Sequence, residues 1–168
     1  ATWHGRARFV GPNAVEVEGE KLEASHIVLA TGAEPIPLGI PGEEHLIDNE
    51  GFLEMESLPR RILLVGGGYI AAEFSHIAAR AGAEVTILQH GERMLKGFDP
   101  DLVGWLMEKY AELGVKLHTD TTVVRIEQVD GAFRVTAGGE SGSTTFDADL
   151  VVHAAGRKPD LASLDLEA

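Results

Sequence analysis

Three small residues, Gly66, Gly68 and Ala71, have the spacing of a G-x-G-x-x-G/A turn, in which backbone N–H groups rather than side chains hold phosphates. The first glycine allows a sharp bend, the second lets a pyrophosphate approach the backbone, and the third small residue lets a helix pack closely on the preceding strand. We therefore predict a dinucleotide site formed by the turn and the residues after it: Gly66, Gly67, Gly68, Tyr69, Ile70 and Ala71.

The flanking sequence has the pattern of the strand and helix that such a turn joins. Residues 62–65 form a short, continuous apolar run, as expected of a parallel strand buried on both faces. After the glycines, Ile70, Phe74, Ile77 and Ala81 recur at helical spacing, and a second strand is expected over 84–89. The fold class predicted from this βαβ pattern is α/β, a Rossmann-like dinucleotide-binding domain with a parallel sheet.

The end of the second expected strand carries the residues that should distinguish NAD from NADP. An acid about 20 residues after the glycines would accept hydrogen bonds from the ribose 2′-OH of NAD. This chain has Gln89 there, and an amide can face either a hydroxyl or a phosphate. His90, Arg93 and Lys96 follow closely and favour NADP. The alternative, in which these are solvated loop charges and Gln89 serves NAD, stays open.

A second helix is expected over 99–113, with Pro100 at its start and Gly114 after its end. Apolar side chains recur along it at helical spacing, and we expect them to form a buried stripe. The members of this stripe are Leu102, Trp105, Leu106, Tyr110 and Leu113.

Composition limits the classes of protein that the chain can represent. Of its 168 residues, 44% are hydrophobic and 24% are charged, as in an ordinary globular protein. The net charge of −13 argues against a nucleic-acid partner, and no apolar run has the length of a membrane span. Seven dispersed histidines and no cysteine predict no metal site. No charged-then-apolar leader is visible, so we expect a cytoplasmic protein.

An internal repeat flanks the glycine turn. Residues 22–35 align without a gap against residues 146–159, and each copy contains an apolar strand pattern followed by Gly and Pro. A glycine-punctuated meander of short strands is expected ahead of each copy, over 8–23 and 121–146, the second being a crossover back to the sheet. No glycine turn precedes the first copy, so we expect it to be the remnant of a second, similar domain that has been cut away.

These motifs, in this order, resemble the central part of the flavin-dependent pyridine nucleotide-disulfide oxidoreductases, the family that includes glutathione reductase, dihydrolipoamide dehydrogenase and mercuric reductase. The resemblance spans nearly the whole chain. It is carried by Ala30-Thr31-Gly32, Leu58-Pro59, the run over 66–74, Leu95-x-x-Phe98-Asp99 and Ala155-Gly156-Arg157-x-Pro159.

The resemblance implies a domain plan. Residues 1–57 would be the last strands of an FAD domain and a crossover, 58–157 the NAD(P) domain, and 158–168 a tail returning to the FAD domain. The cofactors implied are NADP, favoured over NAD, and FAD in the intact enzyme. The intact enzyme would be a homodimer, whereas the present chain would be a monomer without catalytic activity.

The resemblance also implies roles for single residues. Tyr69 matches an aromatic gate over the flavin, and Glu73 matches an acid that pairs with a flavin-side lysine, so both are candidate catalytic residues. His90 and Lys96 lie at or near the positions of two cations that bind a 2′-phosphate, and Ala71 matches NADP-dependent members. The strand endings of the two repeats add four cofactor-binding candidates: Thr31, Gly32, Ala155 and Gly156.

The sequence therefore predicts the NAD(P)H-binding part of a flavin-dependent disulfide reductase, its partners being a nicotinamide dinucleotide and the remainder of its own flavoenzyme. Two alternatives remain open at this point. One is a non-catalytic dinucleotide-binding module that acts as a sensor or interaction domain. The other is a flavoenzyme of the NADH oxidase or ferredoxin reductase type, without disulfide chemistry.

Overall fold

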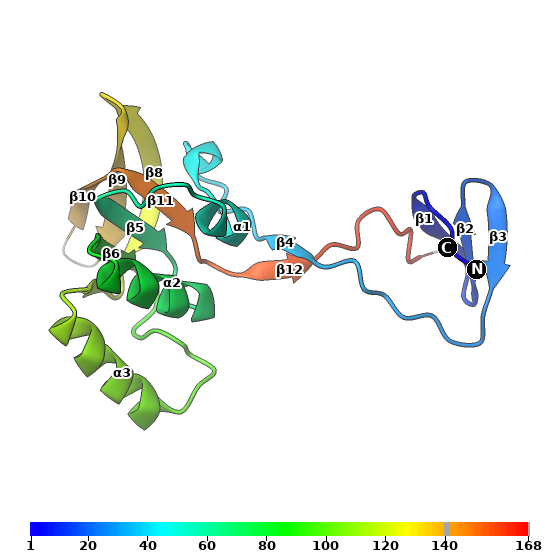
Figure 1. Ribbon diagram of the computed structural model, residues 1–168, viewed down its shortest axis with the longest axis horizontal. Helices are drawn as coiled ribbons and strands as arrows, with labels where there is room; N and C mark the ends of the chain where they lie inside the picture. The colour runs from blue at the N-terminus through cyan, green and yellow to red at the C-terminus, as the bar shows by residue number, and fades with distance from the viewer. Residues whose placement is uncertain (140–141, 168) are drawn as a thin grey trace. The chain divides into compact units, whose positions relative to one another are not determined.

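A computed structural model describes residues 1–139 and 142–167 of the chain. The chain forms two compact units, coloured along the sequence in Figure 1. The first unit contains residues 1–34 and the segment from Arg157 onward, and the second unit contains Pro35–Gly156. The second unit begins earlier than the expected position 58, because the segment 35–57 packs on it: Ile47 bridges to Val152, and Phe52 stacks on Phe74 with ring centroids 4.2 Å apart.

A parallel sheet with the order β11-β5-β6-β7 forms the centre of the second unit. Its strands are β5 (Arg61–Val65), β6 (Glu84–Leu88), β7 (Lys116–His118) and β11 (Leu150–His153). The helices of this unit are a short 3-10 turn η1 (Glu43–His45), α1 (Asn49–Leu53), α2 (Tyr69–Arg80) and α3 (Pro100–Glu112). The predicted α/β, Rossmann-like class with a parallel sheet is confirmed.

Alternate residues of β5 enter two separate hydrophobic clusters, as the two-residue period of a strand requires. Ile62 and Leu64 belong to the cluster formed with α1 and α2, whereas Leu63 and Val65 belong to the cluster on the opposite face. All four side chains are buried, which explains why β5 reads as a continuous apolar run.

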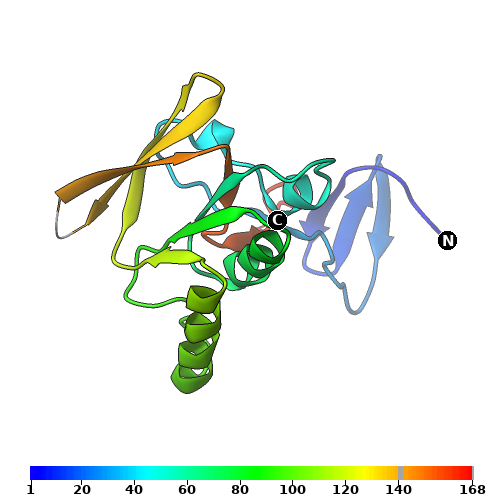
Figure 2. The same ribbon diagram turned by 60° about the vertical axis from the view of Figure 1, so that its left-hand side comes forward.

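An antiparallel meander covers the face of the sheet opposite α2. It has the order β10-β9-β8 and supplies Ile126, Val135 and Ala148 to the second cluster. Its strands are β8 (Thr122–Val129), β9 (Ala132–Gly139) and β10 (Gly142–Ala148). The chain passes through this meander between β7 and β11, which is the crossover expected from the sequence, and Figure 2 shows the layering from a second direction.

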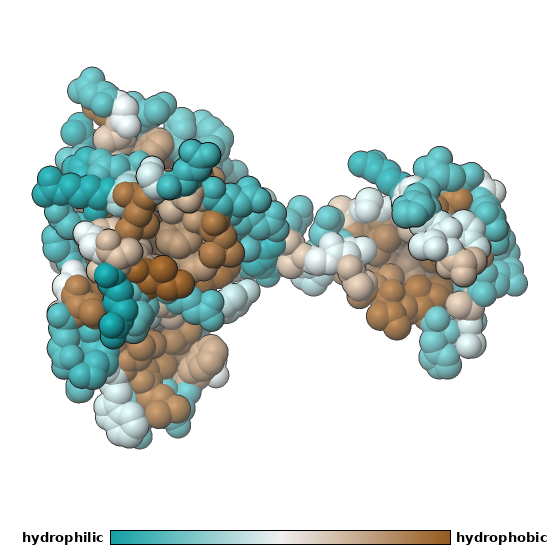
Figure 3. Space-filling model, in the orientation of Figure 1, coloured by the Kyte–Doolittle hydropathy of each residue, from teal (hydrophilic) through white to brown (hydrophobic). Residues whose placement is uncertain are grey.

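The helix stripe expected to be buried was wrong for two residues of α3. The helix begins where predicted, with Asp99 accepting hydrogen bonds from the N–H groups of Asp101 and Leu102. Leu102 and Trp105, however, are 59% and 63% exposed. On α3, Val103 and Tyr110, seven residues apart, are buried, so the helix packs along a narrow stripe that leaves the next face open. Figure 3 shows hydrophobic residues, in brown, at the surface over α3.

Helix α2 differs from expectation in a similar way. Its first turns bury Ile70 and Phe74 as predicted, but Ile77 is 54% exposed and the buried stripe continues through Ala78. Ala81, the last residue of the predicted pattern, is exposed at the C-cap of the helix. The pattern therefore predicted the position of the helix correctly but was wrong about the burial of Ile77 and Ala81. None of the helices in the described residues combines the length and hydropathy of a membrane span.

The first unit contains a three-stranded antiparallel sheet and, except for Pro35, a short strand pair. The sheet has the order β1-β2-β3, with β1 (Ala7–Gly11), β2 (Ala14–Val17) and β3 (Glu20–Glu23), and β4 (Ala33–Pro35) pairs with β12 (Arg157–Pro159). The C-terminal tail returns to this sheet, because the Phe9 N–H donates to the Leu164 carbonyl over 2.7 Å and Leu164 is buried. Ala168, the last residue of the expected tail, lies outside the described residues.

The first copy of the repeat does not form the strand expected of it. The second copy provides β11, which pairs with β5, but residues 24–32 have no assigned strand and Val28 is 88% exposed. The two copies differ in the strands available beside them. An apolar parallel strand is stabilised by neighbouring strands on its edges and by side chains packed on its faces. In the described part of the chain, no strand pairs with the first copy over 27–30.

An ion pair joins Arg61, at the start of β5, to Asp149, the residue before β11. The Asp149 carboxylate accepts hydrogen bonds from the Arg61 guanidinium and, over 3.0 Å, from the Arg61 backbone N–H. Hydrogen bonding to Arg61 holds the pKa of Asp149 below its ordinary value of 3.8. A lowered carboxyl pKa stabilises the fold above that ordinary value, and the stabilisation is lost as the pH falls through and below it.

We expect Asp149→Asn to lower the free energy of unfolding at pH 7, with the difference from wild type shrinking steadily below pH 3.8. Urea denaturation at pH 7 and at pH 3 measures this. Asp147→Asn is the control, because Asp147 forms an exposed pair with Arg134 on the same meander and should contribute little. A difference between Asp149→Asn and wild type that does not depend on pH would contradict the assignment.

Candidate dinucleotide-binding site

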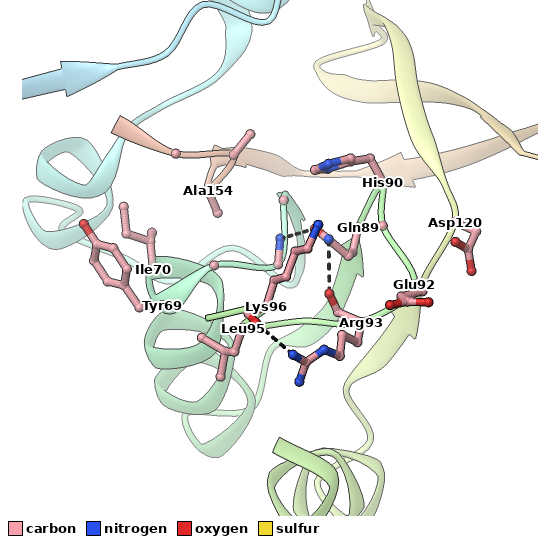
Figure 4. Close-up of a pocket in the computed structure, with 16 residues that line it drawn as sticks. Tyr69, Ile70, Gln89, His90, Glu92, Arg93, Leu95, Lys96, Asp120 and Ala154 are labelled. Atoms are coloured by element: carbon pink, nitrogen blue, oxygen red, sulfur yellow. Dashed lines mark hydrogen bonds between the residues drawn. The ribbon is translucent and has the colours of Figure 1, made fainter. Parts of the chain in front are cut away.

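The carboxyl ends of β5, β6 and β11 meet at a pocket of about 520 Å³, drawn in Figure 4. The glycine turn follows β5, the loop 89–96 follows β6, and residues 154–156 follow β11. Parallel strands bring their carboxyl ends to one edge of a sheet, and ligands of α/β folds bind at that edge. The lining residues are 66–70, 89–93, Leu95, Lys96, Asp120 and 154–156.

The chain itself requires a glycine at position 66. Gly66 has φ +103°, and a Cβ there would lie 2.5 Å from the Ala154 carbonyl oxygen. The turn is also bound to the end of β6, because the Gly66 N–H donates to the Leu88 carbonyl over 2.8 Å. This glycine is therefore explained by the contact between the turn and the end of β11.

At position 68, no contact with the described residues requires a glycine. Its φ is −82°, which other residues adopt readily, and a Cβ there would lie 3.5 Å from the Ala154 carbonyl oxygen, an ordinary contact. The residue lines the pocket at the start of α2. The space beside Gly68 is therefore available to a ligand that approaches the backbone.

Among the described residues, no side chain caps the first turn of α2, and Gly68, Tyr69 and Ile70 of this turn line the pocket. The first N–H groups of an α-helix have no partner within the helix, and they attract anions. Gly68 is the N-cap of this 12-residue helix and carries no side chain that could satisfy them. The turn thus has the features of a phosphate cradle: an uncapped helix start, a glycine without a steric role in the fold, and a pocket.

The Gln89 amide is hydrogen-bonded on both sides to backbone groups. Gln89 lines the pocket, but its Oε1 accepts a hydrogen bond from the Gly67 N–H over 2.8 Å and its Nε2 donates to the Arg93 carbonyl over 3.2 Å. Both polar ends therefore hold backbone groups of the protein, as the dashed lines in Figure 4 show. In this structure the amide therefore faces the turn and its own loop.

The three basic residues of the loop differ in what they face. The Arg93 guanidinium donates to the backbone carbonyls of Lys96, over 2.8 Å, and Phe98, over 3.4 Å. The Arg93 side chain is therefore bound by backbone groups three and five residues later in the chain. Lys96 and His90 both line the pocket, and Figure 4 shows the Lys96 side chain extending across it. Glu92 and Asp120 bring two carboxylates to the same pocket.

The remaining predicted site residues are distributed between the two units. Tyr69 lines the pocket and is 55% exposed, and Ala155 and Gly156 line it from the end of β11. Ala71 is fully buried against the sheet, whereas Glu73 is exposed on α2 and is not a lining residue. Thr31 and Gly32 belong to the first unit, and all lining residues of the pocket belong to the second.

Several lining residues were not predicted: Gly91, Glu92, Leu95, Asp120 and Ala154. A signal existed for Asp120, because it comes shortly after β7 and the carboxyl ends of parallel strands share one edge. The Asp120 N–H donates to the Gly91 carbonyl over 3.1 Å, which brings the two loops together. The hydrophobic periodicity did not mark Ala154 as a pocket residue, because Ala154 directly follows the buried strand β11.

The parallel sheet, the glycine turn between β5 and α2, and the pocket at the carboxyl edge define a Rossmann-like domain of the kind found in flavoprotein disulfide reductases. Comparison with known families makes the assignment specific. The family described as pyridine nucleotide-disulphide oxidoreductase matches residues 1–168, and the chain belongs to this family.

The relatives of this chain include a mercuric reductase and a glutathione reductase, two enzymes named after different substrates. The chain is 34% identical over 166 residues to a mercuric reductase of Lysinibacillus sphaericus, covering 98% of the chain and 30% of that protein. It is 34% identical over 163 residues to a glutathione reductase of Nostoc sp., covering 97% of the chain and 35% of that protein. The chain thus spans about a third of the length of these relatives.

A solved structure has the same fold along nearly the entire chain. The HOCl-induced flavoprotein disulfide reductase RclA from Escherichia coli superposes with a TM-score of 0.82 at 29% identity. The match covers 97% of this chain and 38% of RclA.

Proposed function

We propose that this chain binds a nicotinamide dinucleotide and presents it to a flavin, as the NAD(P)H-binding part of a flavin-dependent reductase. The observation that carries the proposal is Gly68, whose missing side chain leaves a space that the fold does not use, at an uncapped helix start. The family to which the chain belongs supports the same conclusion.

In this proposal the N–H groups that follow Gly68 bind the pyrophosphate, and the dinucleotide lies along the carboxyl edge of the sheet between the loop 89–96 and residues 154–156. The reduced nicotinamide supplies a hydride to the flavin when both cofactors are bound. The chain contributes binding and orientation, through its backbone at the glycine turn. The net charge of −13 opposes anion binding only weakly, because exposed charges beyond about 8 Å are largely screened at physiological salt.

Tyr69 and Glu73 are proposed to act where nicotinamide and flavin meet. Tyr69 is exposed at the pocket and on the first turn of α2, and Glu73 is one turn later on the same helix. Their roles as an aromatic gate and as an acid that pairs with a flavin-side lysine rest on the family resemblance. Both side chains reach solvent in this chain, which such roles require.

The first unit is proposed to belong to an FAD-binding domain, with Thr31 and Gly32 near that cofactor. Val28 and Leu29, 88% and 42% exposed, have the apolar character of a buried parallel strand. By analogy with β11 in the second copy of the repeat, the segment 27–30 would join a sheet formed by further strands of the complete flavoprotein.

NADP is the proposed nucleotide, with Lys96 and His90 as the basic residues nearest to the 2′-phosphate. Both line the pocket, whereas Arg93 is engaged by carbonyl groups of its own loop. A phosphomonoester carries about −1.5 to −2 charges near neutral pH, so a lysine ammonium is the stronger partner and a neutral imidazole the weaker. Glu92 and Asp120 oppose this preference from the same pocket, which keeps it moderate.

A calorimetric titration of the 168-residue chain with NADPH and with NADH tests both the function and the preference. We expect both to bind, NADPH more tightly. Lys96→Met should weaken NADPH binding about tenfold, or about 1.4 kcal/mol, while changing NADH binding less than about threefold. Lys109→Met is the matched control, because Lys109 pairs with Glu112 on α3 and is not a lining residue.

Absence of binding by either nucleotide would contradict the proposed function. A preference of about tenfold for NADH would overturn the NADP assignment and leave the dinucleotide site in place.

A further inference from the structure

We propose that Gln89 is a positioning residue that locks the glycine turn to the loop 89–96, and that it does not read the 2′ substituent of the nucleotide. The part of this inference that concerns affinity rests on the proposed function. The part that concerns the turn concerns the protein alone and is testable without a ligand.

The amide of Gln89 is held on both sides by backbone groups. Oε1 accepts from the Gly67 N–H over 2.8 Å, and Nε2 donates to the Arg93 carbonyl over 3.2 Å. The residue is 8% exposed, although it stands at the rim of a pocket. Withdrawing the amide from Gly67 would leave a buried N–H without its partner, which is unfavourable. A ribose hydroxyl would therefore have to compete with two existing hydrogen bonds.

The backbone of Gln89 is equally fixed. Its N–H donates to the His118 carbonyl over 2.8 Å, and its own carbonyl accepts from the Thr121 N–H over 2.9 Å. The side chain thus starts from an anchored position at the end of β6. Because the backbone of Gln89 is fixed, its amide can fix the positions of the Gly67 N–H and the Arg93 carbonyl.

A second link closes the connection between turn and loop. The Leu95 N–H donates to the Gly67 carbonyl over 2.8 Å, so that both polar groups of Gly67 are held by the loop. The space beside Gly67 is filled as well: a Cβ there would lie 2.9 Å from Cγ of Met94, which is fully buried, and 3.0 Å from Gln89 Oε1. These three hydrogen bonds link Gly67, Gln89, Arg93 and Leu95, and we call this set of contacts the turn–loop clamp.

The clamp has two consequences for a bound dinucleotide. Gly67 donates its N–H to Gln89, so the pyrophosphate would be bound by the N–H groups after it, at the start of α2. The loop that carries Lys96 and His90 would be held in one position relative to those donors. Gln89 would therefore influence NADPH and NADH equally, because the pyrophosphate is common to both.

A carboxylate can replace only half of the clamp. Glutamate at position 89 could still accept from the Gly67 N–H, but it has no hydrogen to donate to the Arg93 carbonyl. Methionine has a similar length and can replace neither bond. The pair Gln89→Glu and Gln89→Met therefore separates the acceptor from the donor function of the amide.

The first test is backbone hydrogen exchange in the nucleotide-free chain, followed at the Gly67 amide by NMR. We expect this amide to be protected in the wild type and in Gln89→Glu, and to exchange at least about tenfold faster in Gln89→Met. Gln128→Met, an exposed substitution on β8, is the control and should leave it unchanged. An unprotected Gly67 amide in the wild type would overturn the clamp.

The second test is titration of the same variants with NADPH and NADH. We expect Gln89→Met to weaken both by the same factor, about tenfold, so that their ratio is preserved. A change of more than about threefold in that ratio would show that Gln89 reads the 2′ substituent and would overturn the proposal. If the wild type bound neither nucleotide, the proposed function would fail, and the exchange experiment would still decide whether the clamp exists.

Discussion

Gly68→Val is expected to fold normally and to lose at least about a hundredfold of its affinity for both NADPH and NADH, or about 2.7 kcal/mol. The backbone at this position has φ −82°, and a Cβ would make only an ordinary contact of 3.5 Å with the Ala154 carbonyl oxygen. The valine side chain would instead occupy the space beside the first N–H groups of α2. The substitution therefore separates binding from folding.

Calorimetric titration measures the affinity, and thermal unfolding without nucleotide checks the fold. Gly104→Val is the matched control, since Gly104 lies on α3 with no atom within 4 Å of an added Cβ and outside the pocket. We expect it to bind both nucleotides like the wild type. Undiminished affinity in Gly68→Val would mean that the phosphates do not lie at the start of α2.

Gly66→Ala is expected to act on the fold and to destabilise the second unit by about 2–5 kcal/mol. Two terms contribute. A non-glycine residue at φ +103° is strained by about 1–2 kcal/mol. In addition, the new Cβ would lie 2.5 Å from the Ala154 carbonyl oxygen and from the Ala155 Cα, and forcing backbone apart costs about 1–3 kcal/mol.

Gly82→Ala isolates the first of these terms. Gly82 also has a positive φ, +98°, but an added Cβ there would meet no atom within 4 Å. Chemical denaturation should therefore show a loss of only about 1–2 kcal/mol for Gly82→Ala and a clearly larger loss for Gly66→Ala. Equal losses would contradict the close approach of the turn to the end of β11.

The parts of the fold that the sequence predicted are those set by local periodicity and by turn chemistry. The apolar run of β5, the helix start after Gly68 and the meander ahead of β11 all depend on neighbouring residues. The face that a helix buries depends on its partner, and this is why Leu102 and Trp105 were misassigned. The strand expected over 27–30 lacked partner strands for the same reason.

Within the site, the sequence predicted the pocket-lining segments better than the direction of their side chains. Gln89 and Arg93 both have polar groups suited to a nucleotide, but each is engaged by backbone carbonyls or N–H groups of its own loop or of the turn. Those partners are created by the conformation of the loop 89–96, in which Leu95 adopts φ +51°. Residue types and spacing carry little information about such a conformation.

The second unit is one uninterrupted stretch of chain, Pro35–Gly156, whose ends are adjacent: the Ile36 N–H donates to the Gly156 carbonyl over 3.1 Å. A stretch with adjoining ends can be inserted into a host domain, or removed from one, with little disturbance of the host backbone at the junction. The nucleotide pocket lies wholly within this stretch. We therefore expect residues 35–156 to be tolerated as an insertion in another host domain, together with their pocket.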